Sequence, residues 1–409
     1  MPKSYSKTQL RKPQLGAAFV ALLSLQATSA VIAEEIKTQS GPVTVESLAQ
    51  LDNPWGITLL PDGSYLISEK PGNLRIFANG KLSEPIKGVP EVSYRRQGGL
   101  LDVEVHPDFA KNKTVYISYT EAAEKQPGGK DIADPRLGQY FEAEDNVIKG
   151  AAVASARLDD GALKDVKVIW RQVPKTMGRG HFGGRLLFAA DGTLFITSGD
   201  RQRFDPSQDM NSNIGKILRI NADGSIPKDN PYVGKSGSRP DIYSLGHRNP
   251  LGAAINPYTQ QLWINEMGPM GGDEVNVVEK AKNYGWPQVS EGDNYDKTPI
   301  PRPSTEPKLA SAAKSWNPSI SPSGMIFYTG DKFAAWKGNA LVGGLSSKAL
   351  FRLTVDGSKV TGEEKIDIGK RIRDVIQDRD GTLLLVIDAS QEGVGGELVR
   401  LTPANSTMR

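Results

Sequence analysis

The chain has 409 residues, of which 50 are Lys or Arg and 47 are Asp or Glu, so its formal net charge is +3. Its 43 glycines and 27 prolines are typical of a turn-rich β protein rather than a helical one. It contains no cysteine, which excludes disulfides and covalently attached haem, and its three histidines are too few and too scattered for a convincing zinc site.

The first 33 residues have the layout of a signal peptide. Four basic residues lie within the first twelve positions, the apolar run LGAAFVALLSL follows, and small residues precede a cleavage point after Ala30 or Ala33. This segment carries four basic and no acidic residues, so the mature chain has a net charge of 3 − 4 = −1, which does not indicate a nucleic-acid partner. We expect a periplasmic or secreted protein in which residues 34–409 form one domain. No second apolar run is long enough to span a membrane.

A turn followed by alternating apolar residues recurs six times along the mature chain. Each copy predicts a hairpin turn that enters a β-strand. The copies are PDGSYLISE from Pro61, HPDFAKNKTVYISYT from His106, ADGTLFITSGD from Ala190, NPYTQQLWINE from Asn256, WKGNALVGGL from Trp336 and RDGTLLLVID from Arg379. They predict an all-β fold, a six-bladed β-propeller with four strands in each blade. An eight-stranded barrel or a β-sandwich is the competing architecture.

Two polar stretches that contain Gly and Pro, residues 121–150 and 287–323, interrupt the repeat. Loops of this length in a compact domain are usually functional or disordered. On a propeller we expect both to rise over one face.

The heptapeptide GRGHFGG, residues 178–184, satisfies the G-x-G-x-x-G pattern of dinucleotide-binding loops, and an acid, Asp200, follows at a suitable distance. That pattern binds a pyrophosphate only where a helix follows the glycines. Here the following residues contain a turn signal at Asp191-Gly192 and are otherwise β-type. We therefore interpret the segment as a tight loop that presents His181 to a ligand. The alternative is a turn whose histidine packs internally or points to solvent.

Three other polar segments allow both a functional and an ordinary interpretation. GHRNP (246–250) is either a rigid loop that aims Arg248 inward or a turn with solvated charge. EMGPMGGDEVN (266–276) offers carbonyls beside carboxylates, which suit Ca²⁺, or is an acidic turn. GKRIRDV (369–375) puts Arg371 and Arg373 on one face of a strand, where they suit an anionic ligand with several carboxylates or are simply solvated.

Seven motifs together resemble those of the soluble dehydrogenases of aldose sugars that depend on pyrroloquinoline quinone (PQQ), the glucose/sorbosone dehydrogenase family. In chain order they are QGGLLDVEVHPDF, GHFGGRLLFAADGTLFITSGD, IGKILRINADGSIPKDNPY, IYSLGHRNPLG, NEMGPMGGDEVNVVEKAKNYGWP, SPSGMIFYTGD and RIRDV. The resemblance runs from NPWGITLLPDG to GGELVRLTP, nearly all of the mature chain, and implies a six-bladed propeller.

The resemblance also implies the roles of individual residues. His181 resembles the catalytic base, Gln97 and Asp200 match the polar residues grouped with it, and Arg248 matches the arginine beside the quinone carbonyl. The expected PQQ contacts are Arg248, Asn249, Arg371 and Arg373, with Trp316 and Ser323 of the SPSG loop packed near the cofactor. The carbonyls of Gly268 and Pro269 match ligands of the Ca²⁺ that holds PQQ, and Glu274 and Tyr284 resemble a second, structural Ca²⁺ site.

One position departs from the family pattern. Several relatives carry a lysine that contacts the cofactor where this chain has Ser346. Lys348 lies two residues further on, which in a strand is the same face, so we expect Lys348 to replace that contact. The insertion at 121–150 is expected to shape the substrate entrance, with Tyr140 and Phe141 stacking on the sugar.

The activity implied by the resemblance is oxidation of the C1 hydroxyl of an aldose to a lactone. Hydride would pass to PQQ held by Ca²⁺, and the electrons would then pass to an external acceptor such as a quinone, a cytochrome or a dye. We expect a monomer or a homodimer. The alternatives are a Ca²⁺-dependent propeller lactonase or other hydrolase, and a propeller that binds glycans without catalysis.

Overall fold

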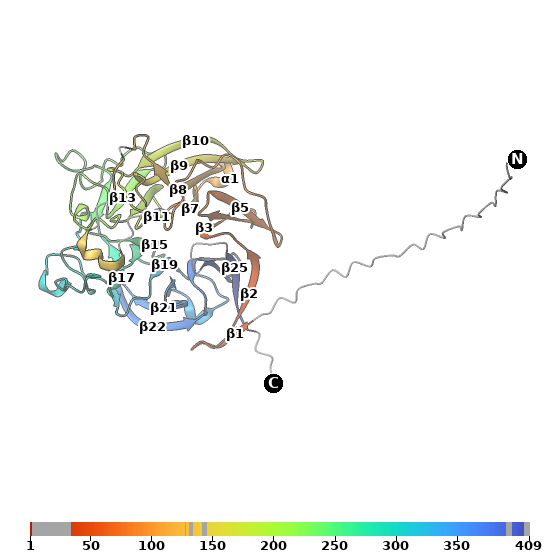
Figure 1. Cartoon of the computed structure of the whole chain (residues 1–409). Coiled ribbons are helices and arrows are strands. Elements are labelled where there is room, and N and C mark those ends of the chain that lie inside the picture. The colour runs from red at the N-terminus through yellow and green to blue at the C-terminus, as the bar shows by residue number, and fades with distance from the viewer. Residues whose placement is uncertain (2–33, 127, 131–133, 141–144, 390–394, 405–409) are drawn as a thin grey trace. The chain divides into compact units, whose positions relative to one another are not determined.

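The computed structural model describes Met1 and residues 34–126, 128–130, 134–140, 145–389 and 395–404. The expected signal peptide lies outside these residues. The described chain from residue 34 onward forms six antiparallel sheets arranged as the blades of a β-propeller, which confirms the predicted fold. Figure 1 shows the blades as a ring coloured from orange through green to blue.

The first three blades follow one another along the chain, each with its strands in sequence order from the channel outward. They are β3 (Pro54–Leu59), β4 (Tyr65–Glu69), β5 (Asn73–Ala78) and β6 (Lys81–Leu82); β7 (Leu100–Val105), β8 (Thr114–Ala122), β9 (Lys149–Asp159) and β10 (Ala162–Arg171); and β11 (Gly183–Phe188), β12 (Thr193–Ser198), β13 (Lys216–Asn221) and β14 (Ile242–Leu245).

The fourth and fifth blades repeat this order, and the sixth combines both ends of the domain. They are β15 (Pro250–Ile255), β16 (Leu262–Glu266), β17 (Asp273–Val278) and β18 (Lys314–Trp316); β19 (Pro322–Phe327), β20 (Ala340–Gly344), β21 (Ala349–Asp356) and β22 (Lys359–Asp367); and β23 (Ile372–Gln377), β24 (Leu383–Asp388), β25 (Gly396–Pro403), β2 (Val43–Gln50) and β1 (Glu34–Ile36). In Figure 1 the blue β25 lies beside the red-orange β2, and their pairing closes the ring.

The six repeated segments of the sequence correspond to one position in the fold. They form β4, β8, β12, β16, β20 and β24, the second strand of each blade. The second strand is flanked by sheet on both edges and by neighbouring blades on both faces, and this explains why its apolar pattern is the most regular in the chain.

Hydrogen bonds from polar side chains link each inner strand to the inner strand of the next blade. Ser118 of β8 accepts the amide hydrogen of Asp102 in its own blade (2.9 Å) and donates to the carbonyl of Gly184 in the next (2.5 Å). Equivalent links surround the channel. The side chains that form the six links are Ser68, Ser118, Thr197, Asn265, Ser323 and Asp374. These links fix the inner strands, and with them the loops that lead into those strands.

The apolar core lies between the blades. Leu66 of β4 and Ile117 of β8 are fully buried in one interface, and Leu341 of β20 and Leu385 of β24 are fully buried in another. Burial of each such side chain contributes about 1.5–3 kcal/mol. The packed blades give the loops at the channel mouth a rigid support.

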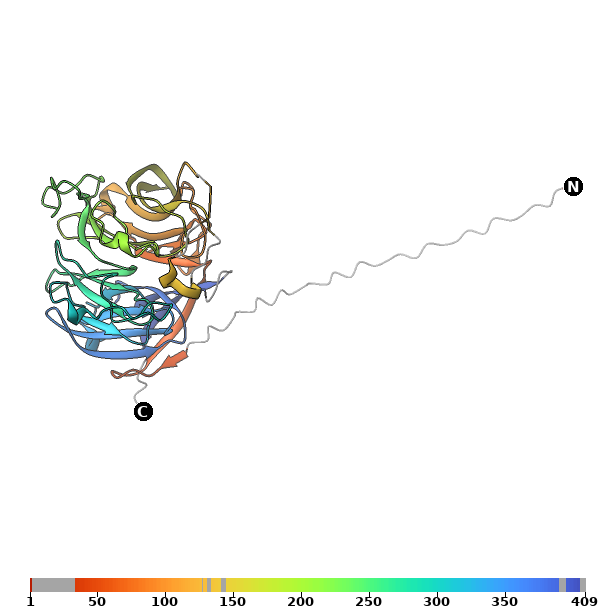
Figure 2. The ribbon, with the colours of Figure 1, turned by 60° about the vertical axis from the view of Figure 1, so that its left-hand side comes forward.

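In the described part of the chain, helical structure is confined to short turns, one of which is the gold coil in Figure 2. They are α1 (Phe109–Asn112), η1 (Pro135–Tyr140), η2 (Asp205–Ser207), η3 (Pro303–Thr305) and η4 (Ala334–Trp336). Within the described ranges, no helix has the length and apolar character that crossing a bilayer requires.

Candidate active site

One end of the central channel opens into a pocket of about 890 Å³, a volume typical of small-ligand sites. The loops that lead into inner strands β7, β11, β15, β19 and β23 form part of its wall, and residues 267–271 after β16 form another part. Seven of the predicted site residues line it, namely Gln97, His181, Arg248, Gly268, Pro269, Arg371 and Arg373. The propeller thus brings together residues that are far apart in the sequence.

His181 is buried at the pocket wall and held by two neighbours, Asp200 and Gln97. Its Nδ1 lies 2.6 Å from Oδ1 of Asp200, and its amide hydrogen is accepted by Oε1 of Gln97 at 2.9 Å. Trp286 donates from Nε1 to the other oxygen of Asp200 at 2.8 Å. Asp200 is therefore fixed on both oxygens, and it fixes the imidazole ring in turn.

The electrostatics of this pair define the tautomer of His181. Burial alone raises the pKa of Asp200, but His181 and Arg248 outweigh that effect and hold the pKa below its ordinary value. An ionised Asp200 only accepts hydrogen bonds, so His181 donates from Nδ1 and keeps a lone pair on Nε2. Burial lowers the pKa of His181. Arg248 and Arg201 lower this pKa further, and Asp200 raises it by less than these lowering effects combined. A neutral imidazole at pH 7 is suited to accept a proton.

The glycines of GRGHFGG shape a loop and do not start a helix. Strand β11 begins at Gly183, where φ is +65° and a Cβ atom would lie 2.7 Å from the carbonyl oxygen of Thr197. Only glycine fits this turn. The structure confirms that the motif is a loop and not the start of a helix, and it places His181 in the pocket wall.

Arg201 is the main support of this loop, and the sequence analysis missed it. The side chain is buried, donates from Nε to the carbonyl of Gly180 (3.0 Å) and from Nη2 to that of Gly178 (2.6 Å), and lies 3.9 Å from the ring centre of Phe182. Its own amide hydrogen bonds to the carbonyl of His181 at 3.2 Å. Its position directly after Asp200 is the one signal in the sequence that could have found it.

Replacing Arg201 by alanine or lysine is expected to lower turnover about 10²-fold, because misplacing a catalytic group by about 1 Å has that effect. Lysine supplies one ammonium group and lacks the planar fork that reaches two carbonyls at once. Steady-state kinetics of both variants test this. Arg219→Ala, which breaks a comparable cluster at the outer edge of the same blade, is the control and should keep normal turnover. Normal turnover in the Arg201 variants would remove Arg201 from the site's support.

Arg248 reaches the pocket from the loop before β15. Its Nη1 donates to the carbonyls of Met267 (3.0 Å) and Gly268 (2.6 Å), and its guanidinium lies 5.2 Å from the ring centre of Trp286. Its amide hydrogen is accepted by Glu266 at 2.6 Å. These contacts place a fixed positive charge in the same wall as the Gly268-Pro269 loop.

Arg371 and Arg373 line another part of the wall and share one carboxylate. Arg373 lies 2.6 Å and Arg371 3.7 Å from Oδ2 of Asp388, the last residue of β24. Their Nε atoms are buried and have no hydrogen-bond partner among the described residues. Burial also lowers the pKa of Arg371. Two guanidiniums with unused buried donors fit an anionic ligand such as the carboxylates of PQQ.

The Gly268-Pro269 loop is tied to the neighbouring loop by Asp273. Its Oδ1 accepts the amide hydrogen of Gly268 (2.8 Å), and its Oδ2 accepts those of Ile320 and Ser321 (both 2.7 Å). A Cβ atom at residue 268 would lie 2.2 Å from the carbonyl oxygen of Gly272. Gly268 and Pro269 thus lie at the pocket wall, and backbone carbonyl oxygens are a ligand type that Ca²⁺ prefers. One lone pair of the Gly268 carbonyl already accepts a hydrogen bond from Arg248.

Glu274 and Tyr284 lie at a separate cavity of about 20 Å³, with room for one ion or water. Asn276 donates from Nδ2 to both Glu266 (3.0 Å) and Glu274 (3.1 Å), while its Oδ1 is buried without a partner among the described residues. Burial and the charge of Glu266 raise the pKa of Glu274 to about 8. This surplus of oxygens fits a cation. The Tyr284 hydroxyl is already engaged with the carbonyl of Val277 at 2.5 Å.

Glu274→Gln is expected to remove a Ca²⁺-dependent gain in thermal stability. A pKa raised in the folded state means that folding retains a proton, so the cation-free protein loses stability as pH rises from about 4.5 toward 8. Ca²⁺ at 100 times its Kd should restore about 2.7 kcal/mol in the wild type. Thermal unfolding at pH 8 with Ca²⁺ and with EDTA, without PQQ, tests this, with the exposed Glu279→Gln as control. An undiminished Ca²⁺ effect in Glu274→Gln would place the cation elsewhere.

Three predicted cofactor contacts lie behind the pocket wall. Asn249 accepts the amide hydrogen of Gly183 (3.3 Å), Trp316 donates to Glu363 (3.0 Å), and Ser323 donates to the carbonyl of Ile372 (2.5 Å). All three are buried among protein groups and are absent from the lining. The residues that form the wall in this region are Asn317, Pro318, Ser319 and Ser321.

The structure also leaves Lys348 outside the pocket. Strand β20 ends at Gly344, and Lys348 is exposed in a turn where its φ is +54°. We expected Lys348 to lie on the same face as Ser346, two positions earlier. This was wrong, because the chain is no longer extended there. Ser346 lines the pocket and accepts a hydrogen bond from Ser321 at 2.8 Å. Phe141 and the side chain of Tyr140 lie outside the described residues.

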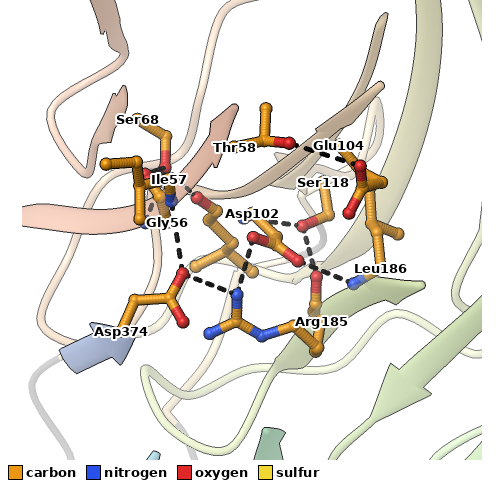
Figure 3. A network of polar contacts seen from close by, with 12 residues as sticks. Gly56, Ile57, Thr58, Ser68, Asp102, Glu104, Ser118, Arg185, Leu186 and Asp374 are labelled. Atoms are coloured by element: carbon orange, nitrogen blue, oxygen red, sulfur yellow. Dashed lines mark hydrogen bonds and ion pairs between the residues drawn. The ribbon is translucent and has the colours of Figure 1, made fainter. Parts of the chain in front are cut away.

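A buried ion network joins the inner strands β7, β11 and β23 (Figure 3). Arg185 donates from Nη1 to Asp102 and Asp374, each at 2.9 Å, and from Nε to the carbonyl of Leu251 at 3.0 Å. Its guanidinium lies 4.6 Å from the ring centre of Trp55. Since Trp55 and Leu251 both line the pocket, Arg185 supports its floor.

The fold and the site define a propeller enzyme whose pocket combines a histidine–aspartate pair, several arginines and wall carbonyls. The sequence profile of the Glucose / Sorbosone dehydrogenase family matches residues 51–400. The chain belongs to this family and is an oxidoreductase.

Individual relatives cover nearly the whole domain. Aldose sugar dehydrogenase YliI of Escherichia coli is 40% identical over 372 residues, which is 89% of this chain and 94% of the relative. The apo crystal structure of the soluble aldose sugar dehydrogenase from Escherichia coli has a TM-score of 0.78 and 39% identity, and covers 88% of this chain and 99% of that one. The PQQ-bound aldose sugar dehydrogenase of Streptomyces coelicolor has a TM-score of 0.68 and 25% identity, and covers 88% and 98%.

Proposed function

We propose that this protein oxidises the C1 hydroxyl of aldose sugars to lactones with PQQ as cofactor and Ca²⁺ as its partner ion. The observation that carries this proposal is the division of the pocket. One part holds a base, His181, beside Arg248, and another holds Arg371 and Arg373 with unused buried donors. A relative named aldose sugar dehydrogenase and another with PQQ bound support the same assignment.

Four groups of this chain would hold the cofactor. Arg371 and Arg373 would bind its carboxylates, and the carbonyls of Gly268 and Pro269 would coordinate Ca²⁺. When bound, PQQ supplies the acceptor for the two electrons and the hydrogen that leave C1 as hydride, and Ca²⁺ polarises that acceptor.

The chain's own residues act on the proton and the charge. His181 takes the hydroxyl proton of C1 at Nε2, since its Nδ1 is committed to Asp200. Asp200 stabilises the imidazolium that results, and Gln97 holds the backbone of His181 in place. Arg248 keeps a preorganised positive charge where negative charge develops during the reaction.

The rival hydrolase interpretation requires a metal ion held by channel carboxylates. In this protein the carboxylates Asp102 and Asp374 are both paired with the guanidinium of Arg185, which already neutralises charge that a metal ion would need. A glycan-binding propeller has no requirement for the His181–Asp200 pair. Both alternatives are therefore less favoured than the dehydrogenase.

An absorbance titration with PQQ separates the three functions. The proposal predicts that adding PQQ and Ca²⁺ to the purified protein gives a saturable change in the quinone spectrum, and that glucose or another aldose then bleaches it toward the reduced form. A lactonase or a glycan-binding protein would leave the quinone spectrum unchanged.

The proposal extends to location and partners. The layout of residues 1–33 supports export to the periplasm or the medium. The electrons would then leave through an external quinone, cytochrome or dye, and the chain would act as a monomer or homodimer.

A further inference from the structure

Tyr295 lies in the pocket wall beside the reacting groups. Its hydroxyl is 3.4 Å from Nη2 of Arg248, and the centre of its ring is 5.7 Å from the Arg248 guanidinium carbon. It stands on the long loop between β17 and β18. Tyr295, Arg248 and His181 line the same pocket, so a sugar whose C1 faces Nε2 of His181 lies in a cavity that Tyr295 borders.

The insertion between β8 and β9 holds this tyrosine in place. The carbonyl of Arg136 accepts the amide hydrogen of Tyr295 at 3.1 Å. Leu137 is fully buried in a cluster with Phe204 and Trp286, against which Tyr295 packs. The second and fourth blades thus meet through η1, the short gold coil in Figure 2.

Arg136 anchors the same turn from its other side. Its guanidinium donates to Asp134 at 2.6 Å and Asp205 at 3.2 Å, and lies 4.1 Å from the ring centre of Phe204. Phe204 and Asp205, from the loop after β12, therefore help to fix the position of η1. A wall supported in this way is rigid enough to select between ligands of different size.

The loop that carries Tyr295 is also tied to the Gly268-Pro269 loop. Met270 and Asp293 exchange both backbone hydrogen bonds, at 3.0 and 3.2 Å, and Arg302 binds Asp293 at 2.8 Å. Tyr295 is thus held between the expected metal loop on one side and the insertion on the other.

We infer that Tyr295, positioned by the turn at residues 134–137, is a specificity-determining residue that selects which sugars reach His181. A tyrosine offers an apolar ring and a polar hydroxyl, the combination that matches the C–H face and hydroxyl rim of a pyranose. We expect its ring to limit the room beyond the first sugar unit, so that a monosaccharide is favoured over a disaccharide. This inference rests on the proposed function.

The test compares kcat and KM for glucose and for the disaccharide maltose in the PQQ-loaded enzyme. Tyr295→Ala should raise KM for glucose with a smaller change in kcat, and should lower the preference for glucose over maltose, expressed as the ratio of kcat/KM values, by about 10-fold or more. Tyr295→Phe, which keeps the ring, should retain most of that preference. Leu137→Ala should move the preference in the same direction as Tyr295→Ala without touching the pocket.

Tyr258→Ala is the matched control, because Tyr258 is 63% exposed and lies outside the pocket. Tyr258→Ala should leave the preference unchanged, and PQQ titration of each variant should give wild-type affinity. If Leu137→Ala fails to fold, the two Tyr295 variants carry the test. An unchanged preference in an active Tyr295→Ala enzyme would overturn the inference alone. A wild-type enzyme that binds no PQQ and oxidises no sugar would overturn the proposed function and the inference together.

Discussion

Replacing His181 by alanine is expected to lower kcat about 10²–10⁴-fold while leaving PQQ affinity near the wild-type value. The reason is that Nε2 of His181 is the group poised to take the substrate proton, whereas the cofactor contacts belong to other residues. Stopped-flow reduction of the PQQ-loaded enzyme by an aldose measures this step directly. His106→Ala is the control, because His106 belongs to a turn in which its Nδ1 accepts the amide hydrogen of Asp108.

The pH profile gives a second readout of the same residue. The base must be neutral, so kcat/KM should fall as pH drops through the pKa of His181, which burial places below its ordinary 6.5. Asp200 raises that pKa, so Asp200→Asn should move the acid limb to still lower pH and also reduce kcat. Near-normal turnover in His181→Ala, or an acid limb unmoved by Asp200→Asn, would exclude this proton-transfer role.

The double variant Arg371→Ala/Arg373→Ala is expected to weaken PQQ binding by about 10² or more. Each charge-assisted hydrogen bond contributes about 1.5–3 kcal/mol, and every 1.4 kcal/mol is tenfold in affinity. The loss should be larger than for either single variant, since Asp388 would then keep only its longer ion pair with Lys70, at 3.8 Å. Fluorescence or absorbance titration with PQQ in excess Ca²⁺ measures the change.

The matched control for these arginines is Arg352→Ala. Arg352 pairs with Glu364 at 2.7 Å on the outer part of the fifth blade, far from the pocket lining. It should reduce stability without altering PQQ affinity. If the double arginine variant binds PQQ as tightly as the wild type, the anionic ligand site lies elsewhere in the pocket.

The repeats that predicted six blades also contain a recurring polar residue, which the fold prediction did not use. Its second-strand segments carry a polar residue after a β-branched one, as in Ile67-Ser68, Ile117-Ser118, Ile196-Thr197 and Ile264-Asn265. These polar side chains form four of the six hydrogen-bonded links between inner strands. The fifth copy has Gly343 there, and Ser323 of its inner strand forms the link instead.

In five of the six copies, an acidic residue lies at the end of the repeated segment or directly after it. These residues are Glu69, Glu121, Asp200, Glu266 and Asp388. Three of these acids hold functional groups of the site, because Asp200 binds His181, Glu266 binds the backbone of Arg248, and Asp388 binds Arg373. Comparing the copies position by position would have found Glu266 and Asp388 from the sequence.

Other features depend on contacts that no local pattern encodes. Arg201 and Tyr295 owe their places to loops from other parts of the chain, and the pairing of β2 with β25 joins the two ends of the domain. The expectation for Lys348 failed because strand alternation holds only while the chain is extended, and β20 ends at Gly344.

The most direct test of the account is turnover of the reconstituted mature protein. Purified protein supplied with PQQ and Ca²⁺ should reduce a redox dye with one or more members of a panel of aldoses. That activity should vanish when PQQ is omitted or when EDTA removes the metal. Dye reduction that persists without PQQ, or no reduction by any aldose in a protein shown to bind PQQ, would contradict the assignment of this pocket to PQQ-dependent sugar oxidation.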